Sequence, residues 1–351
     1  MTSSAKISFI LNARNDGYTS DYIEKLNLTL ACLAAQALRY EFHVEVIIVE
    51  WNPPADQLYL SQRLKKVSNA FLKAMVITVD PKYHQGIDGG DSRPIHCLRA
   101  LNVGIRRASG RFITPLASDS LLSDEIFEYF IKAGMEEHHV YRLDRCDVSD
   151  EILDDLTPSE RMQSNLVKLC PQNIHNRYSN QDEILLNHHG IKPLHTNACG
   201  DFLLMPKAAW HNMHGYIENC HAACLDGDSI SLYAAVASGL DEVRLNDDCV
   251  VYKFSHQKMT SLKITVADNL SNRIKRIVIK SISKDRIKQK FWSNIFDWPR
   301  RKVSGFDGTF PSMEKNFTSE ARKWMNNPKQ QICLNDSHWG LGNIKLPVAE
   351  L

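Results

Sequence analysis

The stretch CLRALNVGIRRASGRFITPLASDSLLSDE, residues 97–125, decides the fold. Apolar residues at helical spacing predict a helix over residues 96–108, and Gly110 is expected to end it by taking a positive φ. The apolar run that follows, residues 111–116, predicts a buried strand that opens into the polar loop ASDS. A helix, a buried strand and a polar loop at the strand's carboxyl end are typical of an α/β sheet with a ligand site at that end.

The same alternation precedes this stretch. Continuous apolar runs rich in branched residues predict buried strands, and apolar residues three and four positions apart predict the helices between them. The expected strands cover residues 7–11, 44–49 and 75–79, and the expected helices cover residues 21–40 and 56–72. Strand, helix, strand, helix, strand is the opening of a doubly wound, mostly parallel sheet flanked by helices.

Beyond residue 125 the pattern becomes less regular. We expect a helix over residues 124–135, a long polar loop over 151–194, and then strand, helix and strand at 201–205, 228–238 and 250–254. Residues 263–290 are basic at helical spacing, and we place a domain boundary near residue 258. The expected organisation is a domain over residues 1–258, with a nucleotide-binding half (1–125) and an acceptor half (126–258), followed by a helical, basic C-terminal extension over 259–351.

The composition excludes several classes of protein. The 351 residues are 43% hydrophobic and 24% charged, which is typical of a globular chain rather than a disordered or fibrous one. The formal net charge of +1 provides no field that would draw the protein onto a nucleic acid, so an anionic ligand must be met by local basic residues. Nine cysteines without a C-x-x-C pair, no signal-peptide pattern and no long apolar run predict a reduced, soluble protein of the cytoplasm.

Residues 97–125 resemble the helix, strand and metal-loop segment of family 2-like GT-A glycosyltransferases. The residues that carry the resemblance are Arg99, Ala100, Asn102 and Gly104 of the helix, Ala108 and Gly110 of the turn, and Ser118, Asp119 and Ser120 of the loop. The resemblance covers about residues 6–258 and implies a GT-A fold, which is Rossmann-like, and a nucleotide-sugar donor. Three phrases, residues 46–54, 141–148 and 335–347, resemble glycosyltransferase-like proteins of bacterial polysaccharide gene clusters.

A site for a nucleotide sugar must neutralise the diphosphate that leaves, and hard divalent cations held by carboxylates can do this. The resemblance gives this part to Asp119, with Mg²⁺ or Mn²⁺ as the cofactor and His256 as a further metal ligand. The loop reads Ser-Asp-Ser where the family carries a D-x-D-type motif, so the first carboxylate is replaced by a serine. The residues expected to bind the donor are Asn12, Arg14, Asp16, Glu50, Arg93, Arg99, Ser118, Asp119 and Ser120.

An enzyme that inverts the anomeric centre needs a general base for the acceptor hydroxyl, and the resemblance gives this role to Asp228, with Asp226 as the second candidate. Both aspartates stand at the expected start of a helix, where an acidic residue also complements the helix dipole. Arg142 and Arg145 either pair with neighbouring aspartates or face the donor diphosphate. The histidines between residues 174 and 221 match no zinc-binding spacing.

The sequence therefore predicts a glycosyltransferase that moves a sugar from a nucleotide-sugar donor to a glycan or lipid-linked acceptor in surface polysaccharide biosynthesis. Two alternatives stay open. A GT-A-like module that binds a glycan or acts as a scaffold without catalysis would explain the incomplete D-x-D motif. A sugar nucleotidyltransferase would use a similar sheet, but it needs a glycine- and basic-rich loop where this chain has NARNDGY, residues 12–18. Residues 263–290 are expected to form a solvated helix face or to dock on the inner face of an anionic membrane, where lipid-linked acceptors wait.

Overall fold

The computed structural model describes residues 6–17, 19, 21–154, 156–157, 165–179, 194–220, 227–254 and 321–351. All of these residues belong to one compact unit. Its helices are α1 (Tyr22–Arg39), α2 (Leu60–Arg63), α3 (Cys97–Arg107), α4 (Asp124–Ala133), α6 (Asn165–Leu169), α7 (Lys207–Met213) and α8 (Gly227–Ala237). Its strands are β1 (Ile7–Ala13), β2 (Val44–Trp51), β3 (Leu72–Val79), β4 (Phe112–Pro115), β5 (Ser120–Leu122), β6 (His139–Arg142), β7 (Asp144–Val148), β8 (Ile174–Tyr178), β9 (Met205–Pro206), β10 (Asp241–Arg244), β11 (Val250–Phe254) and β12 (Val348–Glu350).

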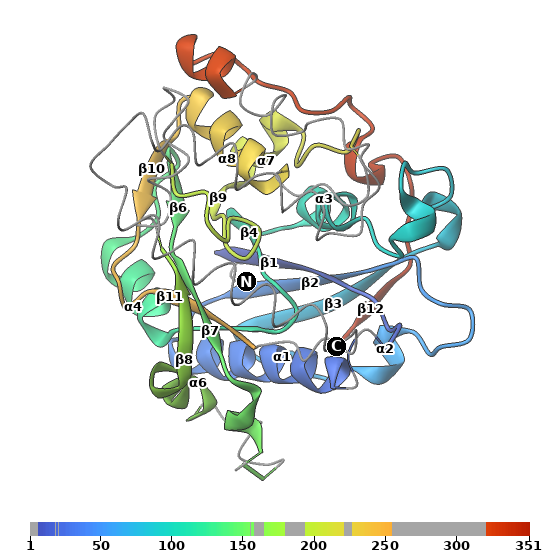
Figure 1. Ribbon diagram of the computed structural model, residues 1–351, viewed down its shortest axis with the longest axis vertical. Helices are drawn as coiled ribbons and strands as arrows, with labels where there is room; N and C mark the ends of the chain where they lie inside the picture. The colour runs from blue at the N-terminus through green and yellow to red at the C-terminus, as the bar shows by residue number, and fades with distance from the viewer. Residues whose placement is uncertain are drawn as a thin grey trace, which may run out of the picture. The chain divides into compact units, whose positions relative to one another are not determined.

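The largest sheet has the strand order β12-β3-β2-β1-β4-β9. Strands β1 to β4 run parallel, whereas the edge strands β12 and β9 are antiparallel to their neighbours. In the centre, Ile7 lies opposite both Val44 of β2 and Phe112 of β4. The predicted α/β class, with a mixed and mostly parallel sheet between helices, is confirmed (Figure 1).

Helices α1 and α3 cover opposite faces of this sheet (Figure 1). Successive side chains of a strand point to opposite faces. Phe9 and Leu11 of β1 belong to the same buried cluster as Leu30 of α1. Ile10, between them, belongs to a second cluster with Val103 of α3. Because both faces are covered, β1 reads as a continuous apolar run rather than as an alternating one.

Two glycines of the segment 97–125 allow close packing against the sheet. A β-carbon on Gly104 would lie 2.4 Å from Cγ2 of Ile10 and 3.2 Å from Cγ2 of Val49, so α3 can approach the strands only because this residue has no side chain. A β-carbon on Gly110 would lie 2.5 Å from Oγ of Ser8. Gly110 is not among the residues with a positive φ, so the expectation that it ends α3 in a left-handed conformation is wrong. Its close approach to β1 is what requires a glycine.

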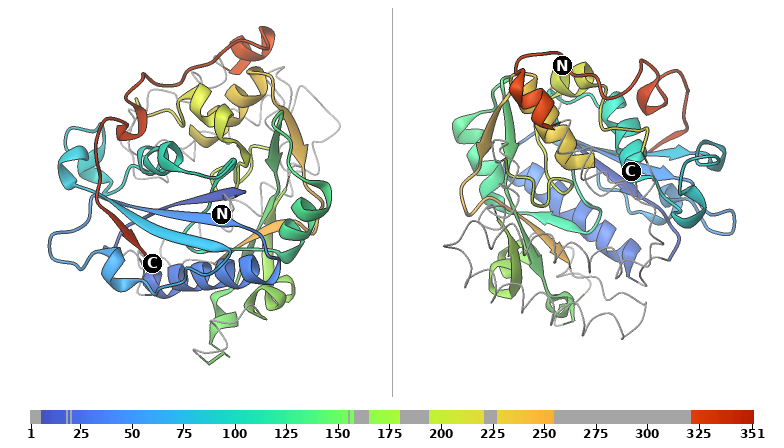
Figure 2. Two further views of the ribbon diagram at one scale, coloured as in Figure 1. Left: turned by 180° about the vertical axis from the view of Figure 1, so that it is seen from behind. Right: turned by 45° about the horizontal axis from the view of Figure 1, so that its top comes forward.

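A four-stranded sheet, in the order β5-β11-β7-β8, adjoins the large one, and β10 pairs with β6 in a two-stranded sheet. Figure 2 shows β7 and β8, drawn in green, running across the direction of the large sheet at one side. Cys146 of β7 and Tyr252 of β11 are buried in a common cluster. Since side chains alternate along a strand, Arg145 and Lys253 point to the opposite face. Cys146 and Tyr252 therefore pack into the apolar cluster, while Arg145 and Lys253 share the opposite face of β7 and β11.

Residues 321–351 fall within the range expected as the C-terminal extension, and they belong to the same compact unit as the large sheet. β12 pairs with β3, with Ala349 opposite Val76. The guanidinium of Arg107, at the end of α3, donates to the backbone oxygens of Gly340, Leu341 and Ile344 at 2.6 to 2.9 Å. The stretch 335–347 is therefore fastened onto α3, and the chain after it completes the sheet.

Two expected elements are shorter in the structure. The helix expected over residues 56–72 is limited to α2: Leu64 is extended, and the N–H of Lys65 donates to the side-chain oxygen of Asn27 instead of continuing the helix. Further on, the side-chain oxygen of Asn69 accepts from the N–H groups of Phe71 and Leu72 at the entry to β3. The strand expected over 201–205 is limited to β9, since only its two residues pair with β4. Among the described helices, none is long and apolar enough to cross a membrane.

Candidate functional site

The order of the large sheet creates a point where neighbouring loops diverge. The chain adds β2 and β3 on one side of β1 and then returns to add β4 on the other side. In open α/β sheets, ligands bind in the crevice outside the carboxyl ends of the strands at such a point. Asn12 lies at that end of β1, and Ser118 and Asp119 follow that end of β4. The structure thus brings these three expected donor residues to one edge of the sheet.

Asp119 lies in a protected position between β4 and β5. The residue is 3% exposed, and its backbone oxygen accepts from the N–H of Phe254 in β11 at 3.2 Å. Ser120, the first residue of β5, lies opposite Lys253 of β11. A buried carboxylate needs a hydrogen-bonding or charged neighbour, and the ammonium of Lys253 interacts electrostatically with Asp119. The pairing of β5 with β11 is what brings this cation to the loop after β4.

Tyr22, the first residue of α1, connects the loops after β1 and β4. Its hydroxyl donates to Oγ of Ser118 at 3.1 Å, and it lies close to the backbone of Arg14 and to the carboxylate of Asp119. Burial raises the pKa of Tyr22, so the hydroxyl stays protonated at neutral pH. The hydroxyl of Thr29, two turns further along α1, donates to the backbone oxygen of Ser118 at 3.2 Å. Together these bonds fix the Ser-Asp-Ser loop against α1.

Asp201 lies between two cations. Its Oδ1 is 3.0 Å from Nζ of Lys253, and its Oδ2 is 2.7 Å from Nη1 of Arg145. Burial alone would raise the pKa of Asp201, but Lys253 and Arg145 outweigh burial and lower that pKa. Burial likewise opposes the charged form of Lys253, but the carboxylates of Asp201 and Asp119 raise the pKa of Lys253. The three groups at the centre of this cluster are therefore all ionised at neutral pH.

The two arginines in the phrase 141–148 have different environments. Arg145 also binds Asp147 at 3.0 Å, and its guanidinium lies 4.0 Å from the ring centroid of Tyr178. Arg142 is fully buried, and its Nε donates to the backbone oxygen of His195 at 2.9 Å. Arg145 therefore belongs to the charged cluster around Asp201, whereas Arg142 supports the buried interior.

Cys97, the first residue of α3, extends the cluster across the crevice. Its thiol is hydrogen-bonded to the side chain of Asn12, and the cations of Arg93 and Lys253 act on it electrostatically. The protein atoms that surround the thiol nevertheless raise the pKa of Cys97, although the residue is exposed to solvent.

Asp228, the expected general base, lies in the first turn of α8 and is partly exposed. Its Oδ1 accepts from the N–H of Ser229 at 2.9 Å. Its Oδ2 lies 3.0 Å from the position that a β-carbon on Gly200 would take. Gly200 directly precedes Asp201, so the carboxylate of Asp228 faces the backbone beside the Lys253–Asp201 pair, and a larger residue at position 200 would press on it.

The basic residues expected at the donor are partly engaged. Arg14 pairs with Asp16 at 2.8 Å and donates from Nε to the backbone oxygen of Asn52 at 2.5 Å. Arg99, one turn into α3, donates to the backbone oxygen of Glu218 at 3.1 Å. Arg14 and Asp16 thus line the loop after β1, while the bond that Arg99 makes is to the loop before α8.

Two expected donor residues lie beneath the surface. Glu50 is 0% exposed, and its carboxylate accepts from the N–H of Leu60 at the start of α2. Burial raises the pKa of Glu50, although this hydrogen bond and a further one from Thr78 oppose the shift. Ser120 is likewise fully buried. Asp226 and His256 lie outside the described residues, as do residues 263–290, so their roles stay predictions.

Neither Lys253 nor Tyr22 is among the residues expected from the sequence. A signal for Lys253 exists, because it is the one charged residue in the strand VVYKF, residues 250–254. A charged residue in such a strand is rarely buried without a partner. Tyr22 gives no such signal, since it also fits the apolar face of α1.

The described residues around Asp119 do not fit a divalent cation. Such an ion takes several oxygen ligands, and both oxygens of Asp201 are already engaged with cations. The ammonium of Lys253 would also repel a metal ion held by Asp119. Among the described residues, one group has three potential metal-ligand atoms within 4.8 Å of one another. It consists of Glu136, His138 and His139, which lie at and just before the start of β6 and away from Asp119.

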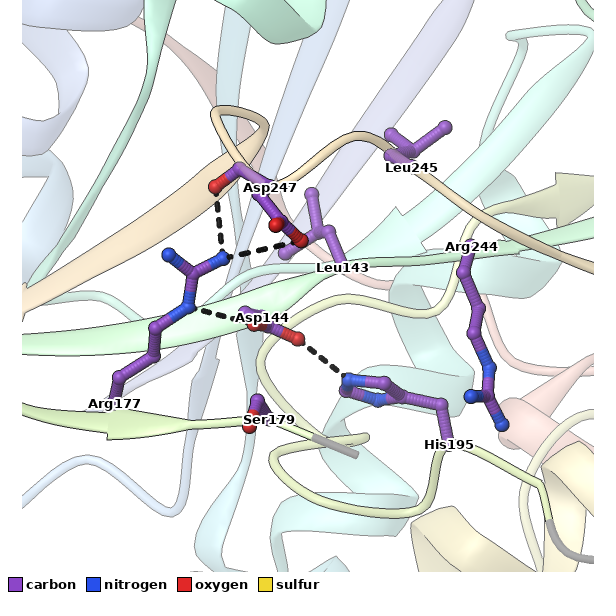
Figure 3. A pocket seen from close by; sticks show the side chains of 8 residues that line it. All are labelled: Leu143, Asp144, Arg177, Ser179, His195, Arg244, Leu245 and Asp247. Atoms are coloured by element: carbon purple, nitrogen blue, oxygen red, sulfur yellow. Dashed lines mark hydrogen bonds and ion pairs between the residues drawn. The ribbon is translucent and has the colours of Figure 1, made fainter. Parts of the chain in front are cut away.

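A pocket of about 450 Å³ lies at the ends of β6 and β10 and is lined largely by charged side chains (Figure 3). Asp144 accepts from His195 Nε2 at 2.8 Å and from Arg177 Nε at 2.7 Å. Because the guanidinium of Arg142 can only donate, its approach to His195 Nδ1 at 3.3 Å leaves Nε2 as the protonated nitrogen. These charged groups are paired with one another. Asp144 directly precedes Arg145, so the pocket lies on the opposite face of β7 from the crevice.

No protein-family profile matches the chain, and no curated protein matches it. Solved structures of S. aureus TarS are similar in fold. TarS 1–349 in complex with UDP aligns with a TM-score of 0.42 at 14% identity, over 92% of this chain and 89% of that chain. TarS 1–349 in complex with UDP-GlcNAc gives 0.40 at 15% identity, over 72% and 59%, and S. aureus TarS gives 0.39 at 16%, over 71% and 37%.

TarS is a GT-A glycosyltransferase, the class of proteins that residues 97–125 resemble. In two of these three TarS structures this chain spans less than two thirds of the TarS chain. At these identities and TM-scores the similarity concerns the fold alone. The activity, the substrate and the partners have to rest on this chain's own residues.

Proposed function

We propose that this chain is a glycosyltransferase that moves a sugar from a nucleotide-sugar donor to a hydroxyl group of a glycan or lipid-linked acceptor in surface polysaccharide biosynthesis. The observation that carries the proposal is the position of Ser118 and Asp119 at the carboxyl end of β4, where the sheet order diverges at β1. The ionised pair of Lys253 and Asp201 adjoins this loop. The phrases 46–54, 141–148 and 335–347 support the assignment to polysaccharide synthesis.

The nucleoside end of the donor belongs at the loop after β1. Arg14 is held by Asp16 and by the backbone of Asn52, so its guanidinium has a fixed orientation before the ligand arrives. Asn12 and the start of α3 form the neighbouring wall, with Arg93 exposed close to Cys97. Arg93 in this position can give charge-assisted hydrogen bonds to the donor diphosphate.

The acceptor end belongs near Asp228. In an inverting reaction the acceptor oxygen bonds to the anomeric carbon, the bond from that carbon to the phosphate oxygen breaks, and its electron pair leaves on the nucleoside diphosphate. The proton of the acceptor hydroxyl goes to the carboxylate of Asp228. Asp228 is partly exposed, so an acceptor hydroxyl can reach its carboxylate without a rearrangement of the loop at Gly200. Asp226 is the alternative base.

Calorimetry with a panel of nucleotide sugars tests the donor site. One class of donor should bind the wild-type protein, and Asp119→Asn should weaken that binding at least tenfold, by about 1.4 kcal/mol, because it removes the carboxylate that attracts the ammonium of Lys253 to this loop. Asp241→Asn is the matched control, because Asp241 is exposed at the start of β10. Asp228→Asn should keep donor binding and lose transfer. If no nucleotide sugar binds, the proposal fails.

The same panel separates the two alternatives. A silent module would bind a donor or a glycan and neither transfer nor hydrolyse the sugar. A nucleotidyltransferase would release pyrophosphate from a nucleoside triphosphate and a sugar phosphate, which a glycosyltransferase does not do.

A further inference from the structure

We propose that the ammonium group of Lys253 neutralises the donor diphosphate in place of a divalent cation. This inference rests on the proposed glycosyltransferase function and adds a residue and a charge mechanism to it. A nucleotide-sugar site must supply positive charge to the leaving diphosphate, because that group gains a negative charge as the sugar departs.

Lys253 has the position that this role needs. β11 pairs with β5 so that Lys253 lies opposite Ser120, and the next residue donates its N–H to the backbone oxygen of Asp119. Lys253 also acts electrostatically on Cys97, which begins α3 on the other wall. The ammonium is therefore placed between the loop after β4 and the start of α3, where the strand order predicts the ligand.

The ammonium is anchored and still open to a ligand. Among the described residues it bonds to Oδ1 of Asp201 at 3.0 Å, and an ammonium carries three N–H donors. The side chain of Lys253 keeps 23% of its surface exposed. By contrast, Arg145 is engaged by Asp201, by Asp147 and by the ring of Tyr178. Of these two cations, Lys253 is thus the one able to turn toward a diphosphate.

The neighbouring carboxylates favour an ammonium over a metal ion. The loop after β4 has Ser118 where a second carboxylate would stand, and the hydroxyl of Ser118 already binds Tyr22. Both oxygens of Asp201 are engaged with cations. A divalent ion at Asp119 would therefore meet one carboxylate and a repelling ammonium among the described residues.

The role of Lys253 involves charge and hydrogen bonding but no proton transfer. When the bond between the anomeric carbon and the phosphate oxygen breaks, its electron pair stays on the nucleoside diphosphate. The N–H groups of Lys253 donate to the phosphate oxygens and remain bonded to nitrogen. Such charge-assisted bonds strengthen as the negative charge develops.

Calorimetry in the presence of EDTA tests this role with UDP, GDP and inorganic pyrophosphate as the probes. The wild-type full chain should bind its preferred nucleoside diphosphate as well in EDTA as in Mn²⁺. Lys253→Met should weaken that binding about 10- to 100-fold, and Lys253→Arg should restore most of it. Binding of the corresponding nucleoside monophosphate should fall by a smaller factor. Lys132→Met, at an exposed position of α4, is the control.

Three results would overturn the inference or its basis. Binding by the wild type that disappears in EDTA and returns with Mn²⁺ would assign the charge to a metal, and this result needs no variant to fold. Equal affinity of Lys253→Met and the wild type for the diphosphate would also overturn it. If the wild type binds none of the nucleotides under either condition, the proposed function itself fails.

Discussion

Replacing Gly104 by alanine should destabilise the protein although alanine is the better helix former. Within a helix, alanine is favoured over glycine by about 1 kcal/mol. Against this, the added β-carbon would lie 2.4 Å from Cγ2 of Ile10 and 3.2 Å from Cγ2 of Val49. Both neighbours are fully buried in central strands, and inserting a carbon into such a core costs about 1–3 kcal/mol. Because 2.4 Å is too short for any contact between carbon atoms, we expect the larger cost and a net loss of about 2 kcal/mol.

Urea unfolding measures this loss directly. A double-mutant cycle with Ile10→Ala identifies the cause of the lost stability, because that variant removes the methyl group closest to the added β-carbon. In the Ile10→Ala background, Gly104→Ala should cost at least about 1 kcal/mol less than in the wild type. A rise in the free energy of unfolding on Gly104→Ala in the wild-type background would refute the argument, since helix propensity would then outweigh packing. Donor affinity should fall together with stability, because α3 begins at Cys97 in the wall of the crevice.

Asp144→Asn should destabilise the protein at neutral pH and have little effect in acid, because His195 and Arg177 outweigh burial and lower the pKa of Asp144. The stabilisation is present above the unfolded pKa of about 3.9 and is lost as the pH falls through the folded value; a deficit that persists in acid unfolding curves would contradict this. Arg107→Ala should lower the free energy of unfolding by about 1.5–3 kcal/mol, because three backbone oxygens lose a charged donor. Limited proteolysis should then cut residues 335–347 faster, and an unchanged rate would argue against the clamp. His96 should titrate at about pH 4 because burial lowers its pKa; an NMR midpoint near the ordinary value of about 6.5 would show that the ring is solvated.

The elements that the sequence predicts best are those buried on both sides. β1, β2 and the helix α3 are within a few residues of their expected bounds, because continuous apolar runs and a strong helical period depend little on distant partners. The expected helix over 56–72 is wrong beyond Arg63, where the N–H of Lys65 bonds to the side chain of Asn27, a residue of α1 that is distant in the sequence. β12 gives no pattern of its own, since its three residues become a strand only by pairing with β3.

Some residues of the candidate site can also be predicted from the sequence, and others cannot. Asn12, Ser118 and Asp119 follow from strand order, because the carboxyl ends of parallel strands share one edge. Lys253 and Asp201 lie in segments that are distant in the sequence, and only the pairing of β11 with β5 and the position of the loop before β9 bring them there. Lys253 and Asp201 are recognised as site residues by the ion pair between them, and a sequence does not show which distant residues form an ion pair.

Without β12, strand β3 would be the edge of the large sheet. Residues Leu72–Val79 form a long, mostly buried and apolar strand, and such a strand with unpaired N–H and C=O groups is a template for pairing with other molecules. Val348–Glu350 cover part of this edge. A chain shortened near residue 258 would keep every described residue of the crevice and would lose this cover, as well as the segment bound by Arg107. Such a fragment should aggregate even though it keeps the described residues of the proposed donor site, and we expect residues 321–351 to protect the domain from this pairing as well as to stabilise it.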